Sequence, residues 1–337
     1  MAVQTFSNDV DNLFTTTLSL LERRLSDAIF KQNPLIAWLL ERGRVQYASG
    51  GFDIREPIIY QKNPTVMAYS GYDKLNVTPS QELTMAIFQW RLKAGTISVS
   101  GEEVDVKNNG MQAVIDLLQA KIQVLQDTMR EELNADMVRI ASLKGTKDFL
   151  GLDNFIEQGT FSVVGGINGT THTWWRNQWN TGALTALLNS WQNMYNTCTK
   201  GGRRPDLILA PQTQFERYER EIWYPTDAAG TNNMTGFLRL QKSDSADIGF
   251  GDLMFKGARI RWDEMLEDAT LRPAANDRAI TYFIDSGSIR LVIHQNRNFA
   301  MRPFQVPYDQ DARVAQILLA GNLVSRNRRN LGGIRLT

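Results

Sequence analysis

The sequence predicts an α+β fold, and three patterns along its 337 residues support that class. Two strand-like segments flank a polar, turn-rich stretch between residues 52 and 100. A helical stripe then runs through 109–144, much longer than an average globular helix. A helix, a buried strand and another helix follow one another between 182 and 221, which indicates an α/β unit. We therefore expect one long helix that lies across a sheet, accompanied by a second α/β region.

Residues 1–50 predict a helix, a break and a second short helix. Apolar residues between Val10 and Ile29 recur at steps of three and four. Pro34 interrupts the pattern because proline disfavours helix at the residue before it. The first helix either packs on its own body or forms an arm that packs on a neighbouring subunit, and periodicity leaves both open.

Residues 51–104 predict an extended β-hairpin. FDIREPIIY (52–60) and ELTMAIFQWRL (82–92) are rich in β-branched and aromatic residues, and the stretch between them is dense in turn residues. The alternative is an ordinary two-stranded edge of a sheet. The apolar residues occupy odd-numbered positions up to Ile87 and even-numbered positions from Phe88 on, and a bulge near Gln89 would explain this change.

The strongest helical signal lies in residues 109–144, where one apolar stripe runs from Met111 to Ile140. Asn109 can cap the start and Gly145 suits the end. About 34 residues at about 1.5 Å each give a rod of roughly 50 Å. We expect a spine that lies across a sheet, with a coiled coil as the alternative.

The second half of the chain alternates helices and strands. Helical spacing predicts helices at 182–198 and 211–221, and a polar composition predicts a long mobile loop at 222–250. Strands are predicted at 205–210, 253–263, 279–285, 288–294 and 313–324. The last of these, RVAQILLAGNLV, is apolar on both faces and is therefore expected to be a central strand.

Composition excludes several classes of protein. Lys and Arg number 37 and Asp and Glu 36, whereas a protein dedicated to coating DNA is usually far more basic. The single cysteine, Cys198, allows no intramolecular disulfide and fits a reducing cytoplasm. The start resembles no signal peptide, and no apolar run approaches the roughly 18 residues of a membrane helix. We expect no membrane association.

No pattern predicts catalysis, a cofactor or a metal. His172 and His294 with Cys198 cannot supply a typical zinc site, and VVGGINGT (163–170) lacks the Lys-Ser/Thr of a phosphate-binding loop. Adjacent carboxylates point apart on a helix or strand, so solvated faces are the better account of these pairs. The pairs are Glu102-Glu103, Glu131-Glu132 and Asp263-Glu264.

Two further clusters allow more than one interpretation. Trp174-Trp175 could form a stacking platform for a sugar or a base, but core packing is favoured. The basic cluster near the C-terminus either contacts DNA or forms a salt-bridged junction between subunits. Its members are Arg326, Arg328, Arg329 and Arg335.

Several strings, in this order, resemble the major capsid proteins of tailed bacteriophages. They are PIIY (57–60), AYSGYDKL (68–75), ELTMAIFQW (82–90), ISVSGEE (97–103), NNGMQAVIDLLQAKI (108–122), EELNADM (131–137), VGGING (164–169), TWWRNQ (173–178), RPDLILAPQTQFERYE (204–219) and MFKGARIRWDEM (254–265). No single string is a catalytic signature, so the resemblance depends on their sum. It covers nearly the whole chain from about residue 10.

The resemblance implies the tailed-phage major capsid protein fold and its domains. These are an N-terminal arm (1–50), an extended β-hairpin or E-loop (51–104), a P-domain with the spine helix (105–180), an A-domain (181–299), and a return strand and tail of the P-domain (300–337). It implies a structural protein of the virion that assembles with itself into hexamers and pentamers of an icosahedral shell around double-stranded DNA. The same fold also serves encapsulin-like bacterial nanocompartments, which is the alternative. An enzyme of another class or a DNA-binding module is disfavoured.

The resemblance also implies partners and contacts. Many relatives carry a scaffolding extension of about a hundred residues, but only about fifty precede Gly50, so we expect a separate scaffolding protein, with no need of a scaffold as the alternative. A portal protein, a decoration or cement protein and weak contact with the packaged DNA are further expectations, with assembly in the host cytoplasm. Inter-subunit contacts are expected at Tyr60, Lys62, Tyr69, Tyr72, Lys74, Arg326, Arg328 and Arg329.

Some relatives join subunits by a Lys–Asn isopeptide bond between the hairpin and the P-domain. The candidates here are Lys62 or Lys74 with Asn322, Asn327 or Asn330. Such a bond needs a nearby carboxylate in an apolar pocket, because a protonated lysine is not nucleophilic. The nearest acids in sequence, Asp309 and Asp311, precede the predicted central strand. We therefore expect no covalent cross-link.

Overall fold

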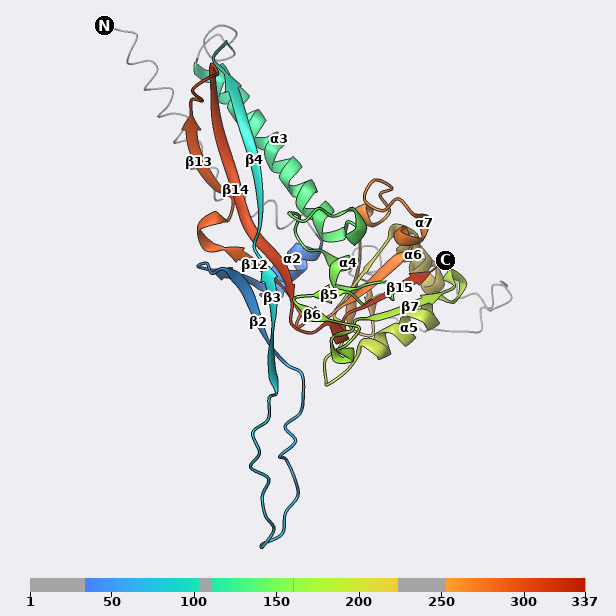
Figure 1. The fold of residues 1–337 in the computed structure, drawn as a ribbon. Helices are drawn as coiled ribbons and strands as arrows, with labels where there is room; N and C mark the ends of the chain where they lie inside the picture. Colours follow the sequence, from blue (N-terminus) through green and yellow to red (C-terminus); the bar gives the residue numbers. More distant parts are fainter. Residues whose placement is uncertain (1–33, 103–110, 160, 224–252, 337) are drawn as a thin grey trace.

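The structure, a computed structural model, describes residues 34–102, 111–159, 161–223 and 253–336. The predicted helix that begins near Val10, the cap at Asn109 and most of the loop at 222–250 lie outside these residues. Figure 1 shows a body of two sheets from which a long hairpin projects.

The first sheet is built around one long strand, β14 (Ala312–Ser325). Its first ten residues pair with β4 (Arg91–Ser100), from Ala312 opposite Ser100 to Gly321 opposite Arg91. Its other neighbours are β13 (Ala300–Gln305) and β12 (Ile289–His294), and β1 (Val45–Ala48) pairs with β12. The predicted central strand is confirmed. The side chains of α2 (Pro34–Glu41) that pack into the core beside this sheet are Leu35, Ile36, Trp38 and Leu39.

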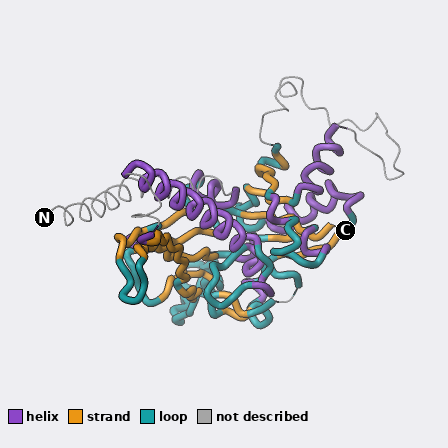
Figure 2. The backbone as a smooth tube through the Cα atoms, turned by 90° about the horizontal axis from the view of Figure 1, so that it is seen from above, coloured by secondary structure: helices purple, strands orange, loops and turns teal. Residues whose placement is uncertain are grey.

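Helix α3 (Met111–Val138) lies along this sheet, as Figures 1 and 2 show. Its buried stripe includes Ile122, Met129, Leu133 and Met137. The helix approaches β4 so closely that a Cβ at Gly95 would stand 2.7 Å from Leu125 Cδ1. The spine helix across a sheet is therefore confirmed, and its 28 described residues span about 42 Å.

The predicted end of this helix at Gly145 is wrong, because α3 ends at Val138. Ile140 is extended, with φ −61° and ψ 141°, and its N–H donates to Leu271 O at 3.4 Å. The backbone therefore leaves the helix where it pairs with a distant segment, although the apolar spacing continues.

The second sheet has six strands in the order β7 (Gln178–Gly182), β15 (Gly332–Leu336), β11 (Ile280–Ile284), β8 (Leu207–Ala210), β10 (Ala258–Trp262) and β9 (Met254–Phe255). Two pairs, β15 with β7 and β10 with β8, are parallel, and the others are antiparallel. Helices α5 (Leu187–Cys198) and α6 (Gln212–Trp223) pack on this sheet, so the predicted helix–strand–helix unit is confirmed. Buried Trp191 stacks on Tyr218 at 5.2 Å between ring centroids.

Strands β2 (Asp53–Ile59) and β3 (Leu83–Gln89) form the base of the projecting hairpin. The bulge predicted near Gln89 is wrong. Strand β3 ends at Gln89 and pairs with β2, whereas β4 begins at Arg91 and pairs with β14. The apolar parity changes because Trp90 joins two strands of different sheets.

Shorter elements complete the described chain: α4 (Leu152–Phe155), the two-stranded β5 (Val163–Val164) and β6 (Ile167–Asn168), and α7 (Ala275–Arg278). The sheets do not divide at the predicted domain boundary between 299 and 300. Strand β15 of the tail lies in the six-stranded sheet, whereas β12 lies beside β14. The domain boundaries stay a prediction.

Among the described residues, no helix combines the length and the apolar character needed to cross a membrane.

Candidate functional site

The base of the hairpin has one buried face and one exposed apolar face. Alternate residues of β2 and β3 pack against the body, and these are Ile54, Glu56, Ile58, Ala86 and Phe88. The opposite face is apolar and exposed at Ile59, Leu83, Met85 and Ile87, with exposed fractions of 45–77%. Nothing in the described chain covers this face, which is the pattern of a contact surface.

The hairpin tip, residues 61–81, contains no regular strand and contributes no buried side chain. Val66, Tyr69, Tyr72 and Val77 are between 68% and 104% exposed. Local turns shape the tip, such as the one in which Asn63 Oδ1 accepts from Thr65 N at 2.8 Å. The tip therefore extends far from the body (Figure 1) without support from the core.

Polar contacts set the direction in which the hairpin leaves the body. Glu56 is fully buried and accepts hydrogen bonds from Arg290 and, at 2.8 Å, from Arg326 Nε. Burial and the neighbouring Arg326 guanidinium lower the pKa of Arg290 to about 10. Ile87 N–H donates to Gly165 O at 2.9 Å, which ties β3 to the β5–β6 turn. A buried carboxylate needs such partners, so the base is held in place.

A groove of about 630 Å³ opens where the hairpin leaves the body. Four segments line it: 57–60 of the hairpin, the 3₁₀ turn Thr173–Trp175, the turn around Lys200–Arg203, and residues 326, 327, 329 and 330 of the tail. Trp174 stacks on Tyr60 at 5.5 Å between centroids and forms an aromatic wall. The charged residues of the lining are all basic: Lys200, Arg203, Arg326 and Arg329.

The structure divides the predicted contact residues into two groups and excludes one residue. Tyr60, Arg326 and Arg329 line the groove. The second group lies on the exposed tip and consists of Lys62, Tyr69, Tyr72 and Lys74. Arg328 belongs to neither group.

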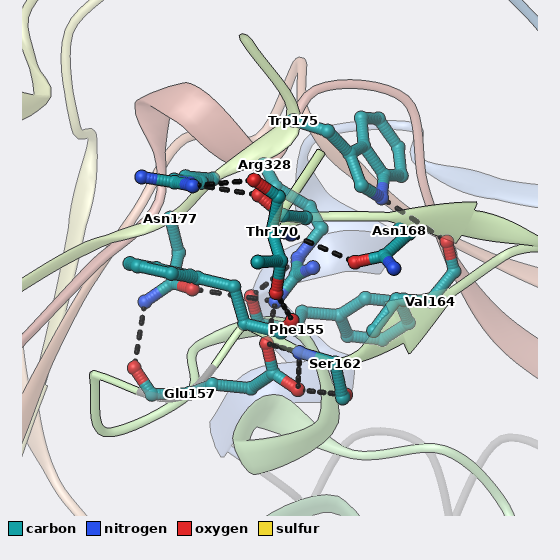
Figure 3. A network of polar contacts seen from close by, with 12 residues as sticks. Phe155, Glu157, Ser162, Val164, Asn168, Thr170, Trp175, Asn177 and Arg328 are labelled. Atoms are coloured by element: carbon teal, nitrogen blue, oxygen red, sulfur yellow. Dashed lines mark hydrogen bonds and ion pairs between the residues drawn. The ribbon is translucent and has the colours of Figure 1, made fainter. Parts of the chain in front are cut away.

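The inter-subunit contact predicted for Arg328 is wrong because its side chain is fully buried inside the subunit. Its guanidinium donates to Phe155 O and to Glu157 Oε2, each at 2.8 Å, and to Asn177 Oδ1 at 3.3 Å (Figure 3). Burial lowers the pKa of Arg328, and Glu157 opposes the shift. The arginine thus joins the tail to the segment after α4.

The predicted basic cluster is dispersed in the fold. Arg326 pairs with Glu56, Arg328 with Glu157, and Arg335 with Asp277 at 3.4 Å. Arg326 and Arg329 line the groove, whereas Arg328 and Arg335 do not, so the four arginines do not form one common patch.

Sequence reasoning missed Lys200, Arg203 and the buried Glu56. Lys200 and Arg203 flank two glycines in a turn, Gly201 and Gly202, both with positive φ. The local sequence of this turn does not indicate that it packs beside the hairpin base. Glu56 lies between Ile54 and Ile58 on the buried side of β2. Because alternate residues of a strand face the same side, the sequence alone could have predicted that Glu56 is buried.

The other candidates from the sequence lie in the core, at a strand end and in a loop. Trp175 is 1% exposed and its indole N–H donates to Val164 O at 3.1 Å, which confirms core packing for that residue. His294 ends β12 with its ring 5.6 Å from that of Trp90, and His172 lies exposed in a loop. No group of three His, Cys, Asp or Glu side chains in the described ranges could hold a metal ion.

One of the adjacent carboxylates was misjudged. Asp263 is 3% exposed, not solvated, and accepts hydrogen bonds from Met265 N at 3.0 Å and Asn134 Nδ2 at 3.4 Å. Burial raises the pKa of Asp263. Glu131 and Glu132 are exposed, as expected.

No protein-family model and no curated protein matches the chain. Solved structures do match it over most of its length. The capsid asymmetric unit of cyanophage A-1(L) has a TM-score of 0.56 at 14% identity, covering 87% of this chain and 90% of that one. The capsid of Myoviridae phage XM1 has a TM-score of 0.54 at 9% identity, covering 88% and 91%.

An encapsulin is similar too. The holo-SrpI encapsulin complex from Synechococcus elongatus PCC 7942 matches with a TM-score of 0.51 at 12% identity, covering 88% of this chain and 86% of that chain. The chain therefore shares its α+β fold with these phage capsid structures and with the encapsulin.

Proposed function

We propose that the chain is the major capsid protein of a tailed bacteriophage, which tiles a closed icosahedral shell as hexamers and pentamers around double-stranded DNA. The observation that carries the proposal is a long hairpin whose tip and outer base face are apolar in part, exposed, and unused by the subunit's own described core. It occurs in a chain with the fold of phage capsids.

A shell requires such a subunit. Heterologous contacts repeat until the surface closes, so each subunit must bury on its neighbours surface that it leaves exposed itself. Many modest contacts add to strong cohesion through multivalency. A net charge of +1 limits repulsion among many copies and avoids tight adhesion to packaged DNA.

In this proposal, the domains follow the boundaries expected from the sequence, with the E-loop at 51–104 and the A-domain at 181–299. Contacts between subunits involve the tip residues Lys62, Tyr69, Tyr72 and Lys74 and the groove residues Tyr60, Arg326 and Arg329. The role is structural, with no catalytic residue and no cofactor. The shell is assembled in the host cytoplasm with a separate scaffolding protein and a portal protein, and a decoration protein is a further partner. Contact with DNA is weak.

The second candidate is the shell of a bacterial nanocompartment, which the similarity to an encapsulin favours. The phage proposal is supported by several similar phage capsids, with TM-scores up to 0.56. A cargo enzyme encoded beside the gene would favour the nanocompartment, as would particles that contain protein cargo.

The test is expression of the full chain with and without its scaffolding protein, followed by sedimentation and electron microscopy. Hollow, roughly icosahedral particles of many copies are expected. A strictly monomeric, monodisperse product under all scaffold and salt conditions would overturn the proposal.

A further inference from the structure

We propose that the groove at the hairpin base receives the β13–β14 turn, residues 305–311, of a second copy of this chain. The inference rests on the proposed shell function and deepens it, because it names the two surfaces that meet. The groove was defined above by its lining residues, and the turn connects Ala300–Gln305 to Ala312–Ser325.

The groove combines positive charge with an aromatic wall. Glu56 lies against Arg326, and Asp285 is 4.0 Å from Arg203, so two of the four cations have a carboxylate partner within the chain. The side chains of Arg203 and Arg326 are still about half exposed. Lys200 is exposed as well, and the lining contributes no carboxylate. The groove therefore favours an occupant that carries negative charge beside an apolar or aromatic group.

The β13–β14 turn has this chemistry. Its sequence, QVPYDQD, contains two aspartates and no lysine or arginine. Val306 is 68% exposed and Tyr308 is 108% exposed, so the ring lies outside the subunit's own core beside Asp309. Gly101 N–H donates to Asp311 O at 3.0 Å, which anchors the end of the turn to the β4 end.

A different copy must supply the turn. The turn precedes β14 and Arg326 of the groove follows it, so the 14 residues of that strand separate them. At about 3.3 Å per residue the separation is roughly 46 Å, too far for contact within one subunit. Two complementary patches at opposite ends of a rigid strand form a heterologous contact, the type that builds rings and shells.

The hairpin tip is the competing occupant, and its charge disfavours it. Residues 61–81 carry Lys62 and Lys74 against the single acid Asp73. This segment is net positive, as is the groove, and like charges brought together cost binding energy. The turn at 305–311 is the acidic alternative.

A charge swap tests the contact. The variants are K200E in the groove, D309K in the turn, and the combined K200E/D309K chain, with K147E as a control at an exposed lysine outside both surfaces. Each is purified as the full chain and assembled as the wild type is. Each single variant is expected to raise the concentration needed for assembly about tenfold or more, because the lost contact recurs at every subunit. The combined chain restores assembly toward the wild type, and K147E leaves it unchanged.

A fourth variant, Y308S, removes a ring that is fully exposed in the subunit and therefore cannot unfold it. It is expected to weaken assembly without shifting the melting temperature of the unassembled subunit. The inference is overturned if the single variants assemble like the wild type, or if the combined chain assembles no better than either one. Failure of the wild type itself to form particles would instead refute the proposed function, so the two failures are distinguishable.

Discussion

Lys144 shows how a single side chain can acquire unusual chemistry in this fold. Its ammonium donates to Phe149 O at 3.1 Å and to Asn154 Oδ1 at 3.0 Å. Burial lowers the pKa of Lys144 to about 7, an effect that Asp136 and Asp153 oppose. The lysine therefore ties the loop after α3 to α4. Keeping its ammonium buried there costs free energy, and this cost depends on pH.

This cost predicts a pH dependence of stability. The unfolded chain holds the Lys144 proton up to its ordinary pKa near 10.5, whereas the folded chain releases it near 7. The contribution of Lys144 to the free energy of unfolding therefore rises with pH between these two values, by about 1.4 kcal/mol per pH unit at most. Urea unfolding of wild type and Lys144→Met at pH 6 and pH 9 checks it.

The difference between the two proteins is the informative quantity. Burial raises the pKa of Cys198 to about 12, which makes stability fall as the unfolded thiol ionises above pH 9. That effect is common to both proteins and cancels in the comparison. Equal stability changes in wild type and variant from pH 6 to pH 9 would disprove the role of Lys144.

Individual buried charges were the part of the site that the sequence could not reveal. Arg328 belongs to an arginine-rich tail that looks exposed in the sequence. Its side chain is buried because the fold places it against Glu157, 171 positions earlier in the chain. Glu56 meets Arg326 across 270 positions. Such burial is decided by tertiary packing, whereas the exposure of the hairpin tip followed directly from its polar, turn-rich composition.

At the scale of elements, two glycines mark places where β-strands are approached closely. A Cβ at Gly321 of β14 would stand 2.6 Å from the carbonyl oxygen of Val292, a backbone atom. A Cβ at Gly95 of β4 would meet the flexible end of Leu125. The two sites differ in whether the neighbour can yield, so they form a matched pair.

We expect Gly321→Ala to lower the free energy of unfolding by about 1–3 kcal/mol, since the backbone must shift. Gly95→Ala is expected to stay within about 1 kcal/mol of the wild type, because side-chain ends can move and a strand glycine is entropically unfavourable. Urea denaturation of the two variants measures both. A Gly95→Ala loss as large as that of Gly321→Ala would contradict the packing described for β4 and α3.

The hairpin tip is expected to be dispensable for folding and required for assembly. Deletion of residues 62–80 removes no buried side chain, so the subunit should keep its circular dichroism spectrum and melting temperature. Particles should not form, because the exposed contact surface of the tip is lost. Normal capsids from the deleted chain would refute the role of the tip.

Elements were predictable where periodicity is strong, and their ends were not. The stripe of α3, the buried run of β8 and the apolar β14 each predicted its element. The end of α3 and the break at Trp90 depend on pairing with Leu271 and with β14, which local sequence does not contain.

At the scale of the whole molecule, the subunits are expected to associate without covalent bonds. Asn322 is fully buried, with Nδ2 donating to Gln89 O at 2.8 Å, and Asn330 is 2% exposed. Their burial closes these two amides to a lysine from another subunit. Asn327, the third candidate, is only partly buried and lines the groove, so the expectation there depends on the lysine. Lys62 and Lys74 lie on the exposed tip, and a lysine attacks an amide only where a carboxylate can take its proton.

Particles boiled in denaturant should therefore run as one band near 38.2 kDa. A ladder of multiples that survives reducing agent would show the expectation wrong, and mass spectrometry would then identify the lysine and asparagine involved. The reducing agent is the necessary control, although the single thiol, Cys198, is buried.

The central claim is that the projecting hairpin of one subunit is completed by its neighbours in a closed shell. A cryo-electron microscopy reconstruction of the assembled particles, at a resolution that traces the chain, tests it most directly. The account predicts closed particles in which an adjacent subunit covers the apolar face at Ile59, Leu83, Met85 and Ile87 and the hairpin tip. Particles in which the hairpin stays solvated, or a chain that never forms particles, would contradict it.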